Sequence, residues 1–241
     1  NQYGVLRQNA RVVPMTSDTL RQPRVTGRLT AYWVGENVAG TTSDATFDQI
    51  SLVAKKLMVL TSMSSELNED SAISLAEFVA SDIARALAYE EDRAGFLGTG
   101  LSTDGGIVGV STSLGTINGT DDGGGLVLAA GNTFDEFTLA NLNSTVARVP
   151  SYARPGAKWY CSPTVFDSAI ARLVLAAGGA LPIDVINGVS TPKALGYPVV
   201  LTEVLPSTNV NSQIALLFGN LAQSTTFGDR RSITISTDSS L

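Results

Sequence analysis

One long helical stretch constrains this chain more than any other feature. Residues 66–97 read ELNEDSAISLAEFVASDIARALAYEEDRAGFL, with no Pro and with Gly only at Gly95. Ala, Leu and Glu dominate, so the intrinsic preference of the segment is strongly helical. At about 1.5 Å per residue, a run of roughly 28 residues extends on the order of 42 Å, longer than an ordinary globular helix. The fold must therefore place other parts of the chain along this helix.

The apolar residues of this stretch recur at three- and four-residue steps and predict a stripe that faces the core. They are Ala72, Leu75, Ala76, Val79, Ala80, Ile83, Ala84 and Leu87. Ser64 or Ser65 is the expected N-cap, because serine accepts a hydrogen bond from a free N–H of the first turn. Gly98 and Gly100 are expected to end the helix in a sharp reversal.

Composition bounds the class of protein. The chain has 241 residues, 44% hydrophobic and 16% charged, which is enough to bury a core in one large or two small domains. The net charge of −6 leaves no broad basic surface for nucleic acid. No window is apolar enough to span a membrane, and no signal pattern opens the sequence, so we expect no membrane partner. The single cysteine, Cys161, is expected to be a buried apolar residue in a chain made in a reducing cytoplasm.

The sequence also lacks the usual chemistry of an active site. Histidine is absent, which removes the commonest general base and metal ligand. There is no phosphate loop with its Lys, no paired metal motif and no nucleophile elbow. Gly123, Gly124 and Gly125 are read as a mobile loop, since no helix bearing a Lys follows them. We therefore predict no enzyme, no catalytic, cofactor-binding or metal residues, and no cofactor.

The first quarter of the chain predicts an arm followed by a protruding loop. Residues 1–24 carry no sustained period and predict either a frayed terminus or an arm that orders against a neighbouring subunit. Residues 28–37 (RLTAYWVGEN) and 47–63 (FDQISLVAKKLMVLTSM) predict two strands. Between them lies the segment 35–48, which is rich in Gly, Thr, Ser and Asp. Because an isolated hairpin is marginal in water, we expect another subunit to support this loop.

The rest of the chain predicts helices interleaved with strands. Helices are expected over 133–149 and from Ser162-Pro163 through Val174, the latter ended by Gly178-Gly179. Strands are expected at 157–161 and in the segments YPVVLTEVLP, QIALLFGNL and SITIST. Segment 107–130 is read as a loop with a short hairpin, and 181–193 as an exposed connection. Without a regular strand–helix–strand repeat, the pattern favours a mixed α+β domain.

The order of these segments resembles the major capsid protein of tailed bacteriophages with the Hong Kong 97 fold. The resemblance begins with AYWVGE, FDQISLVAKKLMVLTSMSSELNEDS, the EEDRAGFLGTG turn and the GGIVGV exit. It continues in KWYCSPTVFDSAIARL, LGYPVVLTEVLP and IALLFGNLAQSTTFGDRRSITIS, and so spans Gly27 to Ser236. Its specificity lies in the sequence of segments rather than in a single motif.

The resemblance implies an α+β Hong Kong 97-type fold with a long spine helix and an extended two-stranded loop. Its implied parts are an N-terminal arm (1–26), the extended loop (27–60), a peripheral domain with the spine helix (61–106), an axial domain (107–217) and a return to the peripheral domain (218–241). In that family a leader is often cleaved, which would explain a start at Asn1. The family normally continues past SITIST with further strands, whereas this sequence stops at Leu241.

The implied function is that of a structural subunit of an icosahedral phage or prophage head shell. Such subunits self-assemble as hexamers and pentamers, with a scaffold or prohead protease as possible assembly partners, and enclose DNA without sequence-specific contacts. The implied locations are the virion and, during assembly, the bacterial host cytoplasm. An encapsulin-like nanocompartment shell shares the fold and is the alternative function, and an independent enzyme or carbohydrate-binding domain is a third.

Two local features bear on assembly. Some family members crosslink subunits through a Lys of the extended loop, but residues 35–48 contain no Lys, and Lys55 and Lys56 lie on the returning strand. That chemistry is not carried over. The basic residues near the N-terminus either pair with acids of neighbouring subunits or remain solvated. The bases are Arg7, Arg11, Arg21, Arg24 and Arg28, and the acids are Glu90, Glu91 and Asp92.

Overall fold

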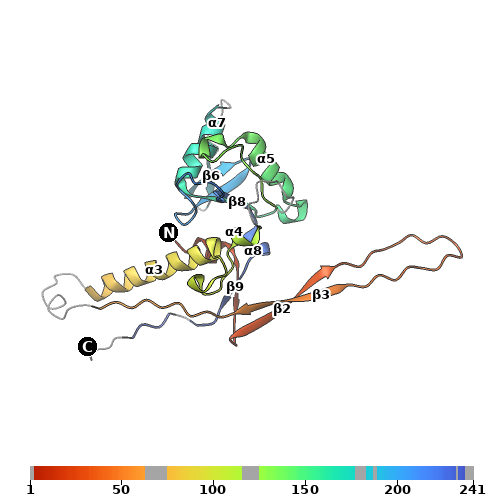
Figure 1. Ribbon diagram of the computed structural model, residues 1–241, viewed down its shortest axis with the longest axis horizontal. Coiled ribbons are helices and arrows are strands. Elements are labelled where there is room, and N and C mark those ends of the chain that lie inside the picture. Colours follow the sequence, from red (N-terminus) through yellow and green to blue (C-terminus); the bar gives the residue numbers. More distant parts are fainter. Residues whose placement is uncertain are drawn as a thin grey trace. The chain divides into compact units, whose positions relative to one another are not determined.

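The chain forms two compact units, seen in a computed structural model that describes residues 3–62, 75–115, 125–176, 183–186, 189–231 and 233–236 (Figure 1). The first unit comprises Asn1–Arg11 and Lys56–Thr226, and the second comprises Val12–Lys55 and Phe227–Leu241. Each unit draws on segments far apart in the sequence. The five-part division implied by the resemblance stays a prediction.

A five-stranded mixed sheet organises much of the first unit. Its strands run in the order β5-β6-β7-β4-β8. β4 pairs in parallel with β7 and antiparallel with β8, so Trp159 lies opposite both Val199 and Phe218. The strands are β4 (Lys158–Cys161), β5 (Ile183–Ile186), β6 (Val189–Ala194), β7 (Tyr197–Leu201) and β8 (Leu216–Gly219). The α+β class and the strands predicted at 157–161, YPVVLTEVLP and QIALLFGNL are confirmed.

The prediction of an exposed connection over 181–193 is wrong, because β5 and β6 form an antiparallel hairpin there. Pro192 and Gly188 suggested a loop. Proline has no backbone N–H to donate to a neighbouring strand. Pro192 is tolerated in β6 because β6 pairs with β7 only at Lys193 and Ala194, so Pro192 has no partner residue in β7 that would accept this hydrogen bond. The β-branched residues Ile183 and Val185 were the better signal.

Helices pack on this sheet and close its core (Figure 1). They are η2 (Phe134–Glu136), α5 (Leu139–Arg148), α6 (Pro163–Val165), η4 (Phe166–Ala171) and α7 (Arg172–Ala176). The short η3 (Ser151–Ala153) follows α5 and contributes no buried residue. Trp159 is fully buried and its Nε1–H donates to the Ala194 carbonyl at 3.0 Å. Cys161 is fully buried too, and burial raises the pKa of its thiol to about 12. The prediction of a buried cysteine in apolar surroundings is confirmed.

The two predicted helices of this region differ in outcome. The helix from Pro163 is present as α6, η4 and α7, with a π-helical turn in η4. The single helix predicted over 133–149 is instead η2 followed by α5. It is interrupted because Thr138 is extended and serves as the N-cap of α5, accepting a hydrogen bond from the Asn141 N–H at 3.2 Å. The predicted end at Gly178-Gly179 lies outside the described residues.

The long helix α3 covers Leu75–Leu97. The predicted caps and the segment 66–74 lie outside the described residues. The prediction that its apolar stripe faces the core is wrong: Val79 and Ile83 are only half-buried and Ala84 is exposed. The buried part is the last turn, where Asp92, Ala94 and Phe96 are covered. Among the residues of α3 whose side chains are described, those of the last turn are the ones buried in the core.

The glycine-rich exit from α3 is as predicted. The Gly98 N–H donates to the Ala94 carbonyl at 2.9 Å. Thr99 and Val108 then form an isolated antiparallel β-bridge. At Gly109 a Cβ would meet the backbone of Gly98 and Leu97, so only glycine fits this close approach. The short η1 (Ser102–Asp104) and α4 (Val110–Ser113) follow, so the segment read as a loop with a hairpin carries a turn of helix.

The second unit contains two pairs of strands. β1 (Arg11–Pro14) pairs with β9 (Thr226–Asp229), and β2 (Thr19–Gly27) pairs antiparallel with β3 (Thr46–Val53). The strand prediction over 28–37 is wrong. So is the alternative of a frayed terminus for 1–24, since α1, β1 and the first part of β2 lie in that segment. Period-2 alternation was absent from β2 because most residues on both of its faces are exposed. The predicted SITIST strand is also wrong, since Ile233–Ser236 form no strand in the part of it described.

Candidate assembly surfaces

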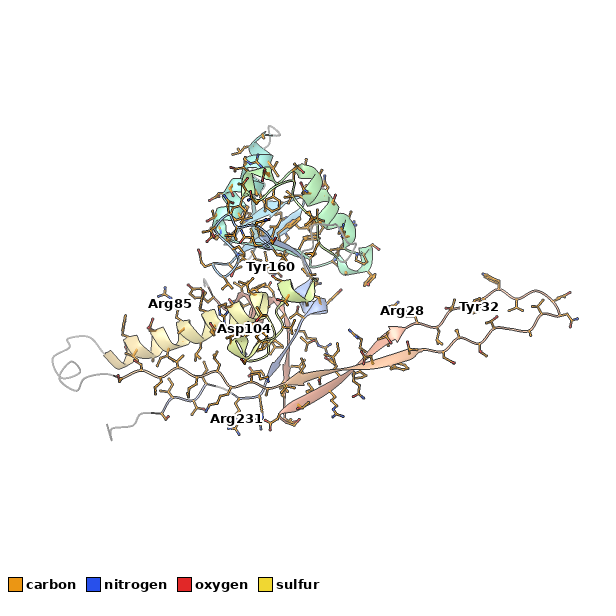
Figure 2. All side chains as sticks on the ribbon, in the orientation of Figure 1. Arg28, Tyr32, Arg85, Asp104, Tyr160 and Arg231 are labelled. Carbon is orange, nitrogen blue, oxygen red and sulfur yellow. The ribbon has the colours of Figure 1, made fainter. Side chains whose placement is uncertain are left out.

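The segment between β2 and β3, residues 28–45, carries large apolar side chains into solvent (Figure 2). Trp33 is completely exposed, at 105% of its reference area. The exposed members of this set are Leu29, Tyr32, Trp33, Val34 and Val38. The segment folds back at a turn in which the Val38 N–H donates to the Gly35 carbonyl at 3.4 Å. Ser43 Oγ accepts a hydrogen bond from the Thr30 N–H and donates one to the Thr30 carbonyl. The loop therefore has a few hydrogen bonds but buries none of these large apolar side chains.

The ribbon formed by β2 and β3 is also uncovered. Val25, Phe47, Ile50 and Val53 are between 43% and 70% exposed. Large apolar side chains on both faces of a two-stranded ribbon usually mark a contact surface, because such a ribbon is marginal alone in water. The loop and this ribbon, residues 19–53, are called the extended arm below.

The sequence leaves two alternatives open for the basic residues near the N-terminus, pairing with acids of neighbouring subunits or solvation. Two of these arginines instead pair with acids of their own chain. Arg24 lies 2.8 Å from Asp48 across the ribbon. The Gln49 backbone N–H and then Arg24 hold the pKa of Asp48 below its ordinary value. Arg7 lies 2.8 Å from Glu91 on α3. Both pairs are exposed enough for solvent to weaken them.

Asp92 forms a clasp that holds the N-terminal segment on α3. Its carboxylate accepts hydrogen bonds from the backbone N–H groups of Gly4, Val5 and Leu6, at 2.7, 3.0 and 2.9 Å. These are the free donors at the start of the short helix α1 (Val5–Asn9), so a side chain distant in sequence caps that helix. Sequence reasoning missed this role. The usable signal was that Ala88 and Phe96 lie four residues either side of Asp92, which places the acid on an apolar face.

A second acid organises the turn after α3. Asp104 accepts from Thr99 Oγ1 at 2.6 Å, from the Thr99 backbone N–H at 2.8 Å and from Arg93 at 2.8 Å. The hydrogen bonds from Thr99, followed by that from Arg93, lower the pKa of Asp104 to about 2. Arg93 also pairs with Glu90, so the three acids predicted to meet a neighbour are all engaged within the chain.

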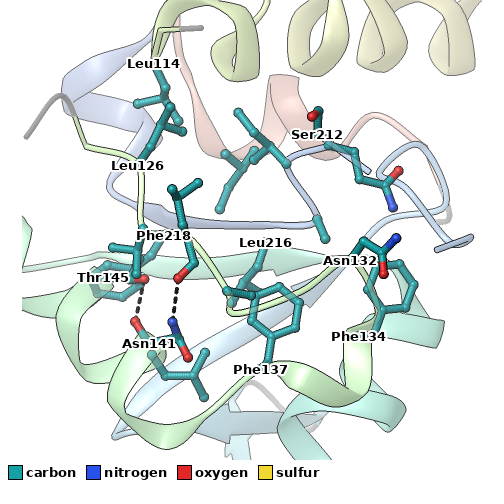
Figure 3. Close-up of a pocket in the computed structure, with 18 of the residues that line it drawn as sticks. Leu114, Leu126, Asn132, Phe134, Phe137, Asn141, Thr145, Ser212, Leu216 and Phe218 are labelled. Atoms are coloured by element: carbon teal, nitrogen blue, oxygen red, sulfur yellow. Dashed lines mark hydrogen bonds between the residues drawn. The ribbon is translucent and has the colours of Figure 1, made fainter. Parts of the chain in front are cut away.

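A cavity of about 660 Å³ opens beside α5 and the segment 210–218 (Figure 3). Its walls are mainly apolar side chains and backbone. Asn141 donates to the Leu128 carbonyl at 2.8 Å, and Thr145 Oγ1 donates to the Asn141 carbonyl at 2.9 Å. No carboxylate or thiol is among the described residues that line it. The cavity offers no general acid–base pair.

No described residues assemble a metal centre or a membrane span. Across the described ranges, no three of the His, Cys, Asp and Glu residues come together as a possible metal site. None of the helices seen there is long and apolar enough to cross a membrane. Of the three glycines read as a mobile loop, Gly123 and Gly124 lie outside the described residues.

Comparison with known proteins identifies the family. Residues 1–240 match the family described as Phage capsid family. The chain belongs to the phage capsid family. A curated relative, the major capsid protein of Klebsiella oxytoca phage phiKO2, is 31% identical over 90 residues, which are 37% of this chain and 21% of that protein. The match thus spans about a fifth of that relative's length.

Solved capsids share the fold of this phage capsid protein. The capsid of an empty GTA particle has a TM-score of 0.73 at 21% identity, covering 94% of this chain and 76% of that chain. Mycobacterium phage Adephagia gives 0.65 at 19% identity, covering 99% and 77%. The encapsulin SrpI of Synechococcus elongatus gives 0.65 at 10% identity, covering 97% and 72%. The predicted family and its Hong Kong 97-type fold are confirmed.

Proposed function

We propose that this phage capsid protein is the repeated subunit of an icosahedral phage or prophage head, assembled as hexamers and pentamers. The observation that carries the proposal is the extended arm. It exposes Trp33, Phe47 and their apolar neighbours, and a lone two-stranded ribbon does not hold such groups stably in water. A neighbouring copy supplies the missing cover, and repeated contacts of moderate size hold a shell without a strong single contact.

In this proposal residues 1–26 are the N-terminal arm, 27–60 the extended loop, 61–106 the peripheral domain with its spine helix, 107–217 the axial domain and 218–241 the return to the peripheral domain. The half-buried stripe of α3, with Val79 and Ile83, supports a role for the spine as a surface that copies share. A helix with an apolar stripe that its own chain leaves half covered has a second partner to pack against.

The proposed contents are DNA held without sequence-specific contacts. A net charge of −6 supports this, because an acidic wall repels the phosphate backbone and keeps the packaged molecule from binding to it. The proposed place of assembly is the bacterial host cytoplasm, with the virion as the product. A scaffold or a prohead protease completes the set of proposed assembly partners.

An encapsulin-like shell is the second candidate, favoured by the similarity in fold to the encapsulin SrpI. The two functions differ in what the particle encloses. Particles purified after expression with the neighbouring genes hold nuclease-protected DNA if the chain builds a head. Protected protein cargo without DNA identifies a nanocompartment instead.

Deletion of residues 38–45 tests the proposed role of the extended arm. The expected result is a folded subunit with unchanged circular dichroism that no longer forms shells by electron microscopy or light scattering. A matched control replaces Gly40 by Ser, because a Cβ at Gly40 meets no atom within 4 Å. A normal yield of shells from the deletion variant, or failure of the control, refutes the role given to the arm.

A further inference from the structure

The two faces of strand β4 have different surroundings. Side chains alternate along a strand, so Trp159 and Cys161 share one face and Lys158 and Tyr160 share the other. The first pair lies in the apolar core. The second pair faces α1 and the end of α3: the Tyr160 ring centroid is 6.0 Å from that of Phe96, and Lys158 Nζ donates to Asn9 Oδ1 at 2.8 Å.

A cavity of about 280 Å³ lies on this second face. It is separate from the larger cavity beside α5 and shares no lining residue with it. Hydrogen-bond donors line it, and no acidic side chain is among its described lining residues. The donors come from Gln8, Asn9, Lys158, Tyr160 and Asn220.

Lys158 has no carboxylate partner among the described residues. Lys158 is half-buried as a residue, and its ammonium group carries three N–H donors, of which the structure assigns one, to the neutral amide of Asn9. A cation withdrawn from water is stabilised by a nearby negative charge. The cavity therefore holds a positive charge that no described part of this chain compensates.

Tyr160, labelled in Figure 2, supplies a second donor without a partner. The residue is 99% buried, at 1% relative exposure, and its hydroxyl makes no hydrogen bond to the described residues. Tyr160 is one of the residues that line the cavity. Burial raises the pKa of Tyr160 above its ordinary value, which keeps the hydroxyl protonated as a donor.

We propose that this cavity binds one carboxylate, with Lys158 as its counter-ion and Tyr160 and Gln8 as neutral donors. One cation balances one negative charge, so a carboxylate matches the cavity better than a doubly charged phosphate. The carboxylate is either a small free acid or an Asp or Glu side chain of a second copy. The second source rests on the proposed shell function, and exposed acids such as Glu36 and Glu77 are available on each copy.

Two measurements on the unassembled subunit test the site itself. Sodium acetate is titrated against sodium chloride at constant ionic strength, following the thermal midpoint and the 13Cε–1Hε NMR signal of Lys158. Acetate at about ten times its dissociation constant is expected to raise the midpoint by about 3 °C, with a saturable shift of the Lys158 signal. The midpoint shift is expected to vanish in Lys158→Met and to need higher acetate in Tyr160→Phe, while Lys56→Met, an exposed control, responds as wild type.

The source of the carboxylate is separated by assembly. If a second copy supplies it, Lys158→Met and Tyr160→Phe lower the shell yield several-fold and acetate inhibits wild-type assembly over its binding range. If a free acid is the ligand, acetate binds and the yield is unchanged. The absence of any saturable acetate effect on the wild-type subunit overturns the proposal, whatever the variants do to assembly. Failure of the wild type to form shells tells against the proposed function and leaves the acetate result standing.

Discussion

The two tryptophans of this chain stand in opposite environments. Trp159 is fully buried on β4, hydrogen-bonded and surrounded by a core that the chain completes by itself. Trp33 is wholly exposed in the loop of the extended arm, where the chain provides no core. One large side chain is thus used for folding and the other is available for association. Within a single copy, this chain therefore leaves part of its apolar surface uncovered.

The largest expected effect tests the folding half of this comparison. Trp159→Ala removes a fully buried ring and is expected to lower the free energy of unfolding by about 3–5 kcal/mol, measured by urea denaturation of the unassembled subunit. Trp33→Ala removes an equally large ring and should change that free energy by less than about 0.5 kcal/mol. Similar losses from both substitutions would show that the arm is packed within one copy.

The next effect concerns the clasp at Asp92. Asp92→Asn removes the charge that three backbone N–H groups share, and we expect it to cost about 2–3 kcal/mol of unfolding free energy. Amide hydrogen exchange at Val5 and Leu6 should accelerate with it. Glu91→Gln, which breaks only the exposed pair with Arg7, should cost less than about 1 kcal/mol. Unchanged exchange in Asp92→Asn would mean that the clasp does not hold the segment.

A pH dependence sharpens the role of Asp104. Its folded pKa of about 2 lies below the unfolded value of about 3.9, so its contribution to stability is complete above about pH 4 and is lost as the pH falls toward 2. Asp104→Asn should therefore lower the urea midpoint at neutral pH, and the difference from wild type should shrink toward pH 2. A difference that stays constant across this range would show that the carboxylate charge is not what stabilises the turn.

The smallest effect is expected at the β6–β7 turn. Leu195 has a φ of 51°, a left-handed conformation that asparagine adopts more readily than leucine. Leu195→Asn should raise the free energy of unfolding by about 0.5 kcal/mol in the unassembled subunit, by urea denaturation. Leu195→Val, which is β-branched and fits this conformation worse, should lower it. A loss of stability in both variants would mean that the exposed leucine side chain packs well enough to outweigh the strain.

Sequence reasoning succeeded where one chain satisfies its own pattern. Residues 158–161 and 163–176 were predicted correctly because the period of their apolar residues is the one that the core requires. It failed at β2, where residues are exposed on both faces and no alternation marks the strand. It failed in the opposite sense at SITIST, whose alternation of Ile233 and Ile235 is present although both side chains are exposed.

The candidate surfaces also include one that the sequence predicted and two that it did not. The loop was predicted from its content of Gly, Thr, Ser and Asp and from the apolar residues on either side. Its position between two paired strands is confirmed, although the first of these strands, β2, lies before the predicted one. The clasp at Asp92 joins residues 86 to 88 positions apart, and the hydrogen bond from Lys158 to Asn9 joins residues 149 positions apart. Nothing local in the sequence marks such pairs. Only the fold brings these residues together.

Amide hydrogen exchange of residues 28–45, compared between the unassembled subunit and the assembled shell, tests the central claim most directly. The account predicts exchange at nearly the intrinsic rate in the free subunit, because few of these amides are hydrogen-bonded, and strong protection in the shell, while amides of β4 stay protected in both. Protection of the loop in the free subunit, or continued fast exchange in the shell, would contradict the claim that a second copy completes the extended arm.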